Sequence, residues 1–62
     1  MFEKAEILIV DDMPEHIAFA GTILRNEGFG VLGATSANAA LKVTEKSKPH
    51  LILLDIKMEG MD

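Results

Sequence analysis

The sequence predicts an α/β fold in which strands and helices alternate as βαβαβ around a parallel sheet. Two short apolar runs, residues 7–10 and residues 51–54, are each followed directly by aspartate. Continuous apolar character is typical of strands that are covered on both faces, as in parallel sheets. Between these runs lie two stretches with helical periodicity, and this alternation implies right-handed crossover connections.

The first helix is expected to begin at Pro14 and to end before Gly28. Proline suits the first turn, where its missing N–H would have no partner, and glycine suits the left-handed position after the last turn. When the residues are placed at ~100° per step, Gly21 falls on the polar half of the wheel. The half expected to be buried consists of Ile17, Phe19, Ala20, Ile23 and Leu24.

The second helix is expected over residues 37–47. Thr35 or Ser36 supplies an N-cap oxygen, and Pro49 prevents the helix from continuing. The positions that share one face at helical spacing are Ala37, Ala40, Leu41 and Thr44.

A short strand at a sheet edge is expected between the helices, where glycines flank Val31 and Leu32. The strand order is then 2-1-3, with the first helix on one face and the second on the other. This is the first half (βαβαβ) of a flavodoxin-like doubly wound parallel sheet.

Charge and composition exclude several classes of protein. Six basic and ten acidic residues among 62 give a net charge of −4, which argues against nucleic-acid binding. There is no cysteine, and two scattered histidines are too few for a structural zinc site. No apolar run reaches the ~7–15 residues of a signal peptide or the ~20 of a membrane span, so a cytoplasmic protein without a membrane segment is expected.

Acidic residues follow two of the three expected strands: Asp11 and Asp12 after the first, and Asp55 after the third. In open parallel sheets, sites form outside the carboxyl ends of the strands, so these carboxylates should converge. Their repulsion should raise the pKa of one or more of them unless a hard cation such as Mg²⁺ neutralises it. The alternative is that they are turn residues, with Asp12 capping the first helix.

The chain resembles the receiver domains of bacterial response regulators in two-component signalling. The resemblance covers the whole chain, and its motifs come in the order and at the spacing of that family. They lie at residues 7–12, 24–29, 34–41 and 49–62.

The resemblance implies a role for each acidic residue. Asp55 matches the aspartate that accepts a phosphoryl group from a histidine kinase or phosphotransfer protein. Asp12 matches the direct ligand of Mg²⁺, and Asp11 matches a second acid that acts through water. Lys57 matches the residue whose backbone carbonyl also binds the metal. The module would be a phosphoacceptor and not an enzyme.

Two departures from the family pattern stand out. Glu59 occupies a position where proline is usual, and the chain has about half the length of a receiver. Residues 1–62 are therefore expected to be a truncated receiver that lacks the carboxyl-terminal half. That half would carry a hydroxyl residue and a lysine that complete the family's switch, so the chain is expected not to switch.

Two other functions remain open. One is a non-catalytic half-domain that associates with itself, forming a homodimer through the exposed third strand at residues 50–55. The other is a magnesium-dependent aspartyl phosphatase, which usually needs a second acid two residues after its nucleophile. Lys57 stands two residues after Asp55, which argues against it. His16 is interpreted as a partly exposed helix residue and His50 as structural.

Overall fold

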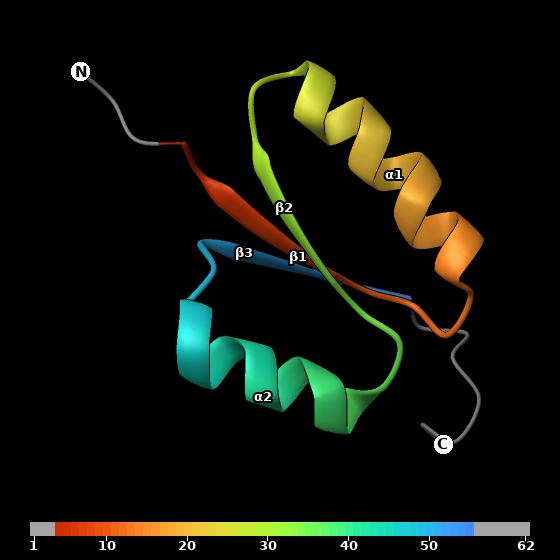
Figure 1. Ribbon diagram of the computed structural model, residues 1–62, viewed down its shortest axis with the longest axis vertical. Coiled ribbons are helices and arrows are strands. Elements are labelled where there is room, and N and C mark those ends of the chain that lie inside the picture. Colours follow the sequence, from red (N-terminus) through yellow and green to blue (C-terminus); the bar gives the residue numbers. More distant parts are fainter. Residues whose placement is uncertain (1–3, 56–62) are drawn as a thin grey trace.

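The computed structural model describes residues 4–55 and shows a three-stranded parallel sheet with one helix on each side (Figure 1). The strand order is β2-β1-β3. The α/β class, the βαβαβ order and the 2-1-3 arrangement predicted from the sequence are therefore confirmed. The elements are β1 (Glu6–Val10), α1 (Pro14–Asn26), β2 (Gly30–Ala34), α2 (Ala37–Ser47) and β3 (Leu51–Leu54).

The register brings the ends of all three strands to one edge of the sheet. The last residue of β1, Val10, is paired with Ala34 of β2 and with Leu54 of β3. The hydrogen bonds extend one step further, because the Asp11 N–H donates to the Ala34 carbonyl at 3.0 Å and the Asp55 N–H donates to the Val10 carbonyl at 3.0 Å. Asp11 and Asp55 thus leave neighbouring strands at the same level.

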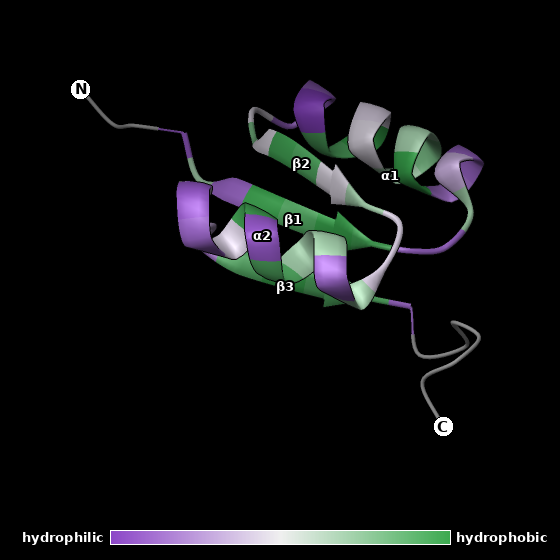
Figure 2. Ribbon diagram, turned by 60° about the horizontal axis from the view of Figure 1, so that its bottom comes forward, coloured by the Kyte–Doolittle hydropathy of each residue, from purple (hydrophilic) through white to green (hydrophobic). Residues whose placement is uncertain are grey.

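Alternate residues of the central strand bury against opposite helices. Leu8 and Val10 are at most 1% exposed and form a core with Ala34. Small or branched side chains complete this core on the α2 side: Leu32, Ala39, Ala40 and Val43. On the other face, α1 lies against β2, where Gly21 approaches Val31 and Ile17 approaches Gly33. Figure 2 shows the strands as the most hydrophobic part of the molecule, between the two helices.

Local signals determine where α1 begins and ends. Pro14 is its first residue, and the N-cap is Met13 in extended conformation, without a side-chain cap. At the other end Gly28 has a φ of 97°, its N–H donates to the Arg25 carbonyl, and the Phe29 N–H donates to the Leu24 carbonyl. This pair of bonds is a Schellman motif, and the left-handed position predicted for Gly28 is confirmed.

The buried face of α1 differs from the one predicted. Phe19 is 72% exposed and Ile23 is 49% exposed, whereas Gly21 is buried. A Cβ atom at Gly21 would lie 3.3 Å from Val31 Cγ1, so the missing side chain is what lets this part of the helix approach β2. The wheel placed the apolar side chains on one half, but close backbone approach decides which strip faces the sheet.

The second helix begins where predicted, at a capping serine. Ser36 Oγ accepts a hydrogen bond from the Ala39 N–H at 3.1 Å. Its C-cap, Lys48, has a left-handed backbone with φ 45°. Of the face predicted from helical spacing, Ala40 packs against the core together with Ala39 and Val43, whereas Leu41 is 62% exposed.

The third strand lies at the edge and is largely uncovered. Each of its four residues is at least 40% exposed. Within residues 4–55, neither helix brings a Cα atom within 8 Å of one in β3. Neither of these two helices is long and apolar enough to cross a membrane.

Candidate functional site: acidic and imidazole groups at the carboxyl edge

Three side chains from different elements meet beyond the ends of β1 and β3. Asp11 follows β1, Asp55 follows β3, and His16 lies in the first turn of α1. Each offers one oxygen or nitrogen donor, and these donors all lie within 4.8 Å of one another. The predicted convergence of Asp11 and Asp55 is confirmed, since they follow paired residues of adjacent parallel strands.

Asp11 is held by hydrogen bonds at both carboxylate oxygens. Oδ1 accepts a bond from the Met13 N–H at 2.9 Å, and Oδ2 lies 3.0 Å from His16 Nδ1. The Asp11 side chain is 11% exposed, whereas that of His16 is 60% exposed. The carboxylate therefore has a fixed orientation, and the imidazole that contacts it is itself exposed to solvent.

The pKa of Asp11 is lowered by its hydrogen-bond partners. The bond from the Met13 N–H lowers the pKa of Asp11 below its ordinary value of 3.8, and the His16 hydrogen bond and charge act in the same direction. A side-chain hydrogen bond with Asp55 also lowers it, while partial desolvation opposes the shift. Crowding of acids was expected to raise the pKa of at least one carboxyl group. The pKa of Asp11 is instead lowered, because donors to its ionised form outweigh the loss of water.

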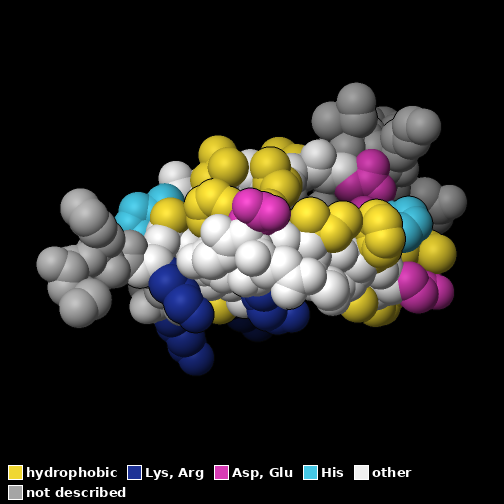
Figure 3. Space-filling model, turned by 90° about the horizontal axis from the view of Figure 1, so that it is seen from above, with side chains coloured by type: hydrophobic (Ala, Val, Ile, Leu, Met, Phe, Trp, Pro, Cys, Tyr) yellow, Lys and Arg dark blue, Asp and Glu magenta, His cyan; other side chains and the backbone are white. Residues whose placement is uncertain are grey.

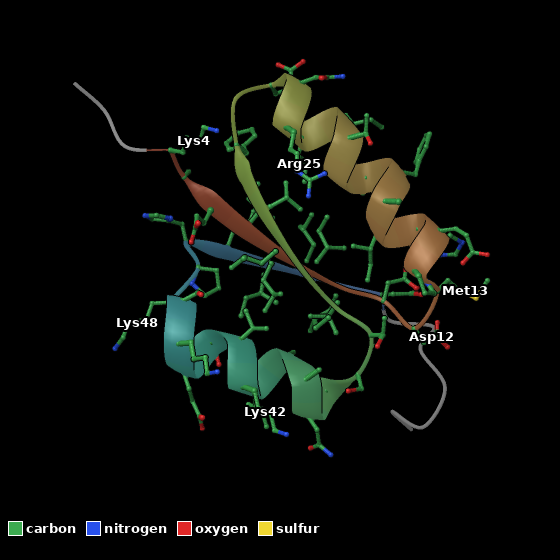
Figure 4. The ribbon with its side chains drawn as sticks, in the orientation of Figure 1. Lys4, Asp12, Met13, Arg25, Lys42 and Lys48 are labelled. Atoms are coloured by element: carbon green, nitrogen blue, oxygen red, sulfur yellow. The ribbon has the colours of Figure 1, made fainter. Side chains whose placement is uncertain are left out.

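Asp12 lies outside this group, so the predicted convergence of all three carboxylates is wrong for Asp12. It is exposed in the loop between β1 and α1, beside Met13 (Figure 4). It does not cap α1, since the N-cap is Met13 and no side chain accepts a cap hydrogen bond there. The alternative interpretation of Asp12 as a helix cap is thus wrong, and its role as a metal ligand stays a prediction. Lys57 and Glu59 lie outside the described residues.

His16 is the member of the group that sequence reasoning undervalued. It was interpreted as a partly exposed helix residue, and it is exposed, but its ring nitrogen also contacts Asp11. The available signal was its spacing: Pro14 starts the helix so soon after β1 that the first turn lies over the strand end. His50 directly precedes β3, and its Nδ1 accepts a hydrogen bond from the Glu6 N–H at 2.9 Å, as suits a structural residue. The two imidazoles occupy opposite ends of the molecule (Figure 3).

An open hollow of about 460 Å³ adjoins the group. Its floor is apolar and is formed mainly by β1 and β3, with Ala20 of α1 at its side. Asp11, His16 and Asp55 provide its polar lining. The hollow leaves room for a cation with water ligands next to Asp55. Oxygen donors of this kind suit Mg²⁺, which keeps several waters and takes few protein carboxylates.

Comparisons with known proteins agree with this geometry. The family model of the response regulator receiver domain matches residues 7–62. The chain is 42% identical over 60 residues to the transcriptional regulatory protein YvrH of Bacillus subtilis, a match covering 95% of this chain and 25% of that protein. It is 37% identical over 57 residues to sporulation initiation phosphotransferase F of the same organism, covering 92% of this chain and 46% of the relative.

A third relative is the transcriptional regulatory protein GlrR of Escherichia coli, 36% identical over 60 residues, covering 97% of this chain and 14% of the relative. The chain thus spans less than half the length of each of these relatives. No solved structure was found that matches it significantly. The family model, the relatives and the parallel 2-1-3 sheet lead to one conclusion: the chain belongs to the response regulator receiver domain family.

Proposed function

We propose that this chain is a phosphoacceptor module of a two-component phosphorelay in the cytoplasm, which receives a phosphoryl group on Asp55. The observation that carries the proposal is the position of Asp55 directly after β3, beside the fixed carboxylate of Asp11 and an open hollow. Membership of the receiver family supports the same role. The phosphodonor would be a histidine kinase or a phosphotransfer protein.

The chemistry requires an ionised nucleophile whose charge is balanced. A carboxylate oxygen of Asp55 would form a bond to phosphorus while the phosphorus–nitrogen bond of a phosphohistidine breaks, and the released imidazole nitrogen would take a proton. Bound Mg²⁺ would neutralise the charge between the carboxylates and the incoming phosphoryl group. Asp55, Asp12 and the Lys57 carbonyl would hold the ion directly, with Asp11 acting through a water.

The low pKa of Asp11 supports its part in this scheme. Because the Met13 N–H and His16 favour the ionised form, Asp11 keeps its negative charge next to the nucleophile at neutral pH. The same two partners hold its oxygens in place, so the residue needs no reorganisation to accept hydrogen bonds from water around an ion.

The experiment is phosphorylation of the 62-residue chain by a small-molecule phosphodonor with and without Mg²⁺. A hydroxylamine-sensitive acyl phosphate should form only with Mg²⁺ and should be absent from Asp55→Asn. Asp12→Asn should need a higher Mg²⁺ concentration. Glu15→Gln removes an exposed acid in the first turn of α1 and is the matched control. Equal labelling of Asp55→Asn and the parent chain would refute the assignment.

We further propose that the 62-residue chain by itself takes up the phosphoryl group without the family's conformational switch. In this family, a hydroxyl residue and a lysine that follow two later strands contact the phosphoryl oxygens. Beryllofluoride should therefore change backbone NMR shifts only near residues 11–16 and 55. Shift changes spread over α2 and β2 would contradict this proposal.

Self-association is a second candidate function, and one observation favours it. The strand β3 presents four apolar side chains that are 40–57% exposed, together with an unpaired edge within the described residues. Such an edge recruits another strand, so we propose a two-fold dimer in which the β3 strands of two copies pair antiparallel. Sedimentation at micromolar concentration should show a dimer, and Ile52→Pro should dissociate it with the circular dichroism retained. A folded monomer of the parent chain would rule it out.

A further inference from the structure

The group at the carboxyl edge contains a nitrogen donor that a magnesium site does not use. His16 Nδ1 lies 3.0 Å from Asp11 Oδ2, and Asp55 completes a set of three donors within 4.8 Å. Mg²⁺ prefers oxygen ligands, whereas imidazole nitrogen suits Zn²⁺ and related first-row ions. The composition argued against a structural zinc site of cysteines and histidines. The fold brings together another kind of donor set, one imidazole with two carboxylates.

The dimensions of the group suit a tetrahedral ion. Ligand bonds of ~2.0–2.2 Å place neighbouring donors of a tetrahedral site ~3.3–3.6 Å apart. The observed Nδ1–Oδ2 separation of 3.0 Å is close to that spacing, and all three donors lie within 4.8 Å of one another. The 60% exposure of the His16 side chain gives an ion access, and the adjoining hollow leaves a fourth position for water.

We propose that Asp11, His16 and Asp55 form a second ion-binding mode of this edge, selective for zinc-like divalent ions over Mg²⁺. The ion takes the place of the proton between His16 Nδ1 and Asp11 Oδ2, which is released to solvent, and it binds Nδ1 and one oxygen of each carboxylate. Asp12 has no part in this mode, because it is exposed and lies outside the group of three.

A zinc ion bound in this mode coordinates the Asp55 carboxylate, which is the group that would attack phosphorus. Zinc therefore competes with phosphoryl transfer to Asp55, so that the modification becomes sensitive to the transition-metal supply. This consequence rests on the proposed phosphoacceptor function, whereas the zinc site itself does not.

The test is a titration of the 62-residue chain with Zn²⁺ alone and with Mg²⁺ alone, followed by calorimetry and by the ring ¹⁵N shifts of the two histidines. The ring nitrogen signals of His16 should move with zinc and those of His50 should not. His16→Gln should weaken zinc binding about tenfold or more, and its Mg²⁺ affinity should change far less. His50→Gln removes the other imidazole, at the opposite end of the molecule, and is the matched control. Circular dichroism confirms that each variant is folded.

Asp12→Asn separates the two modes. It should weaken Mg²⁺ binding and leave zinc binding within about threefold, because an exposed charge outside the ligand set interacts only weakly with the ion. The ratio of phosphorylation with and without zinc should fall well below one in the parent chain and return to one in His16→Gln. If zinc binds His16→Gln as tightly as the parent chain, or if zinc and Mg²⁺ affinities fall together in Asp12→Asn, the inference is wrong. Failure of phosphorylation in Mg²⁺ without zinc would refute the proposed function alone.

Discussion

Replacing Gly33 by alanine tests how closely α1 packs against β2. This packing also determines the position of His16. A Cβ atom built on Gly33 would lie 2.7 Å from Ile17 Cγ2 and 3.7 Å from Ile17 Cδ1. Real Cβ contacts are essentially never below 3.0 Å, so the first turn of the helix must move away or Ile17 must change rotamer. Ile17 directly follows His16, which means that any displacement also alters the imidazole–Asp11 contact.

The expected cost follows from the severity of this overlap. Adding a methyl group to a packed contact of this kind costs about 1–3 kcal/mol. A folded chain of 62 residues has a total stability of only about 3–9 kcal/mol at 0.05–0.15 kcal/mol per residue. The substitution should therefore remove a large part of the free energy of unfolding, measured by urea denaturation with circular dichroism.

Gly30→Ala is the matched control, since it makes the same change in the same strand. Its Cβ would meet Glu6 Cγ at 3.2 Å, a side chain that can give way, so the cost should stay below about 0.5 kcal/mol. In an Ile17→Ala background, which removes the clashing methyl groups, Gly33→Ala should become nearly neutral. Equal costs for Gly33→Ala and Gly30→Ala, or an unchanged cost in the Ile17→Ala background, would refute the packing argument.

Three further outcomes are expected. Leu8→Ala, at a fully buried position of the central strand, should cost about 2–5 kcal/mol and leave much of the chain unfolded in circular dichroism at 25 °C. Gly28→Ala should cost about 1–2 kcal/mol in urea denaturation, because an L-residue is strained at a φ of 97°, whereas Ser47→Ala at the end of α2 should be nearly neutral. Because the pKa of Asp11 is lowered on folding, its contribution to stability is present above its ordinary value of 3.8 and is lost as the pH falls below it. The acid side of a stability–pH profile should thus be shallower in Asp11→Asn, and an unchanged slope would contradict the pKa assignment.

Much of the fold could be predicted from the sequence because its signals are local. Pro14 and Gly28 bracket α1, Ser36 caps α2, and apolar runs without alternation mark β1 and β3. Each of these signals acts through the backbone of its own segment, through a missing N–H, a positive φ or a capping oxygen. Right-handed crossover connections between these elements then favour a parallel sheet in the order 2-1-3.

The acidic part of the candidate site was predictable for the same reason. Parallel strands end at one edge, so residues that directly follow β1 and β3 must be neighbours once the order is known. The sequence could not decide which carboxylate of the pair Asp11–Asp12 points inward. The structure shows that Asp11 is buried and hydrogen-bonded to the Met13 N–H and to His16, while Asp12 is exposed.

What the sequence alone determined was the list of elements, their order and the edge at which the acids gather. Tertiary packing decided the rotation of each helix about its own axis. Gly21 and Gly33 let α1 approach β2 along a strip that leaves Phe19 in solvent, and this same placement brings His16 over Asp11. Helical periodicity describes the distribution of side chains around the helix axis, but which side of the helix faces the sheet depends on contacts between residues distant in the chain. The position of the His16 imidazole beside Asp11 results from those contacts.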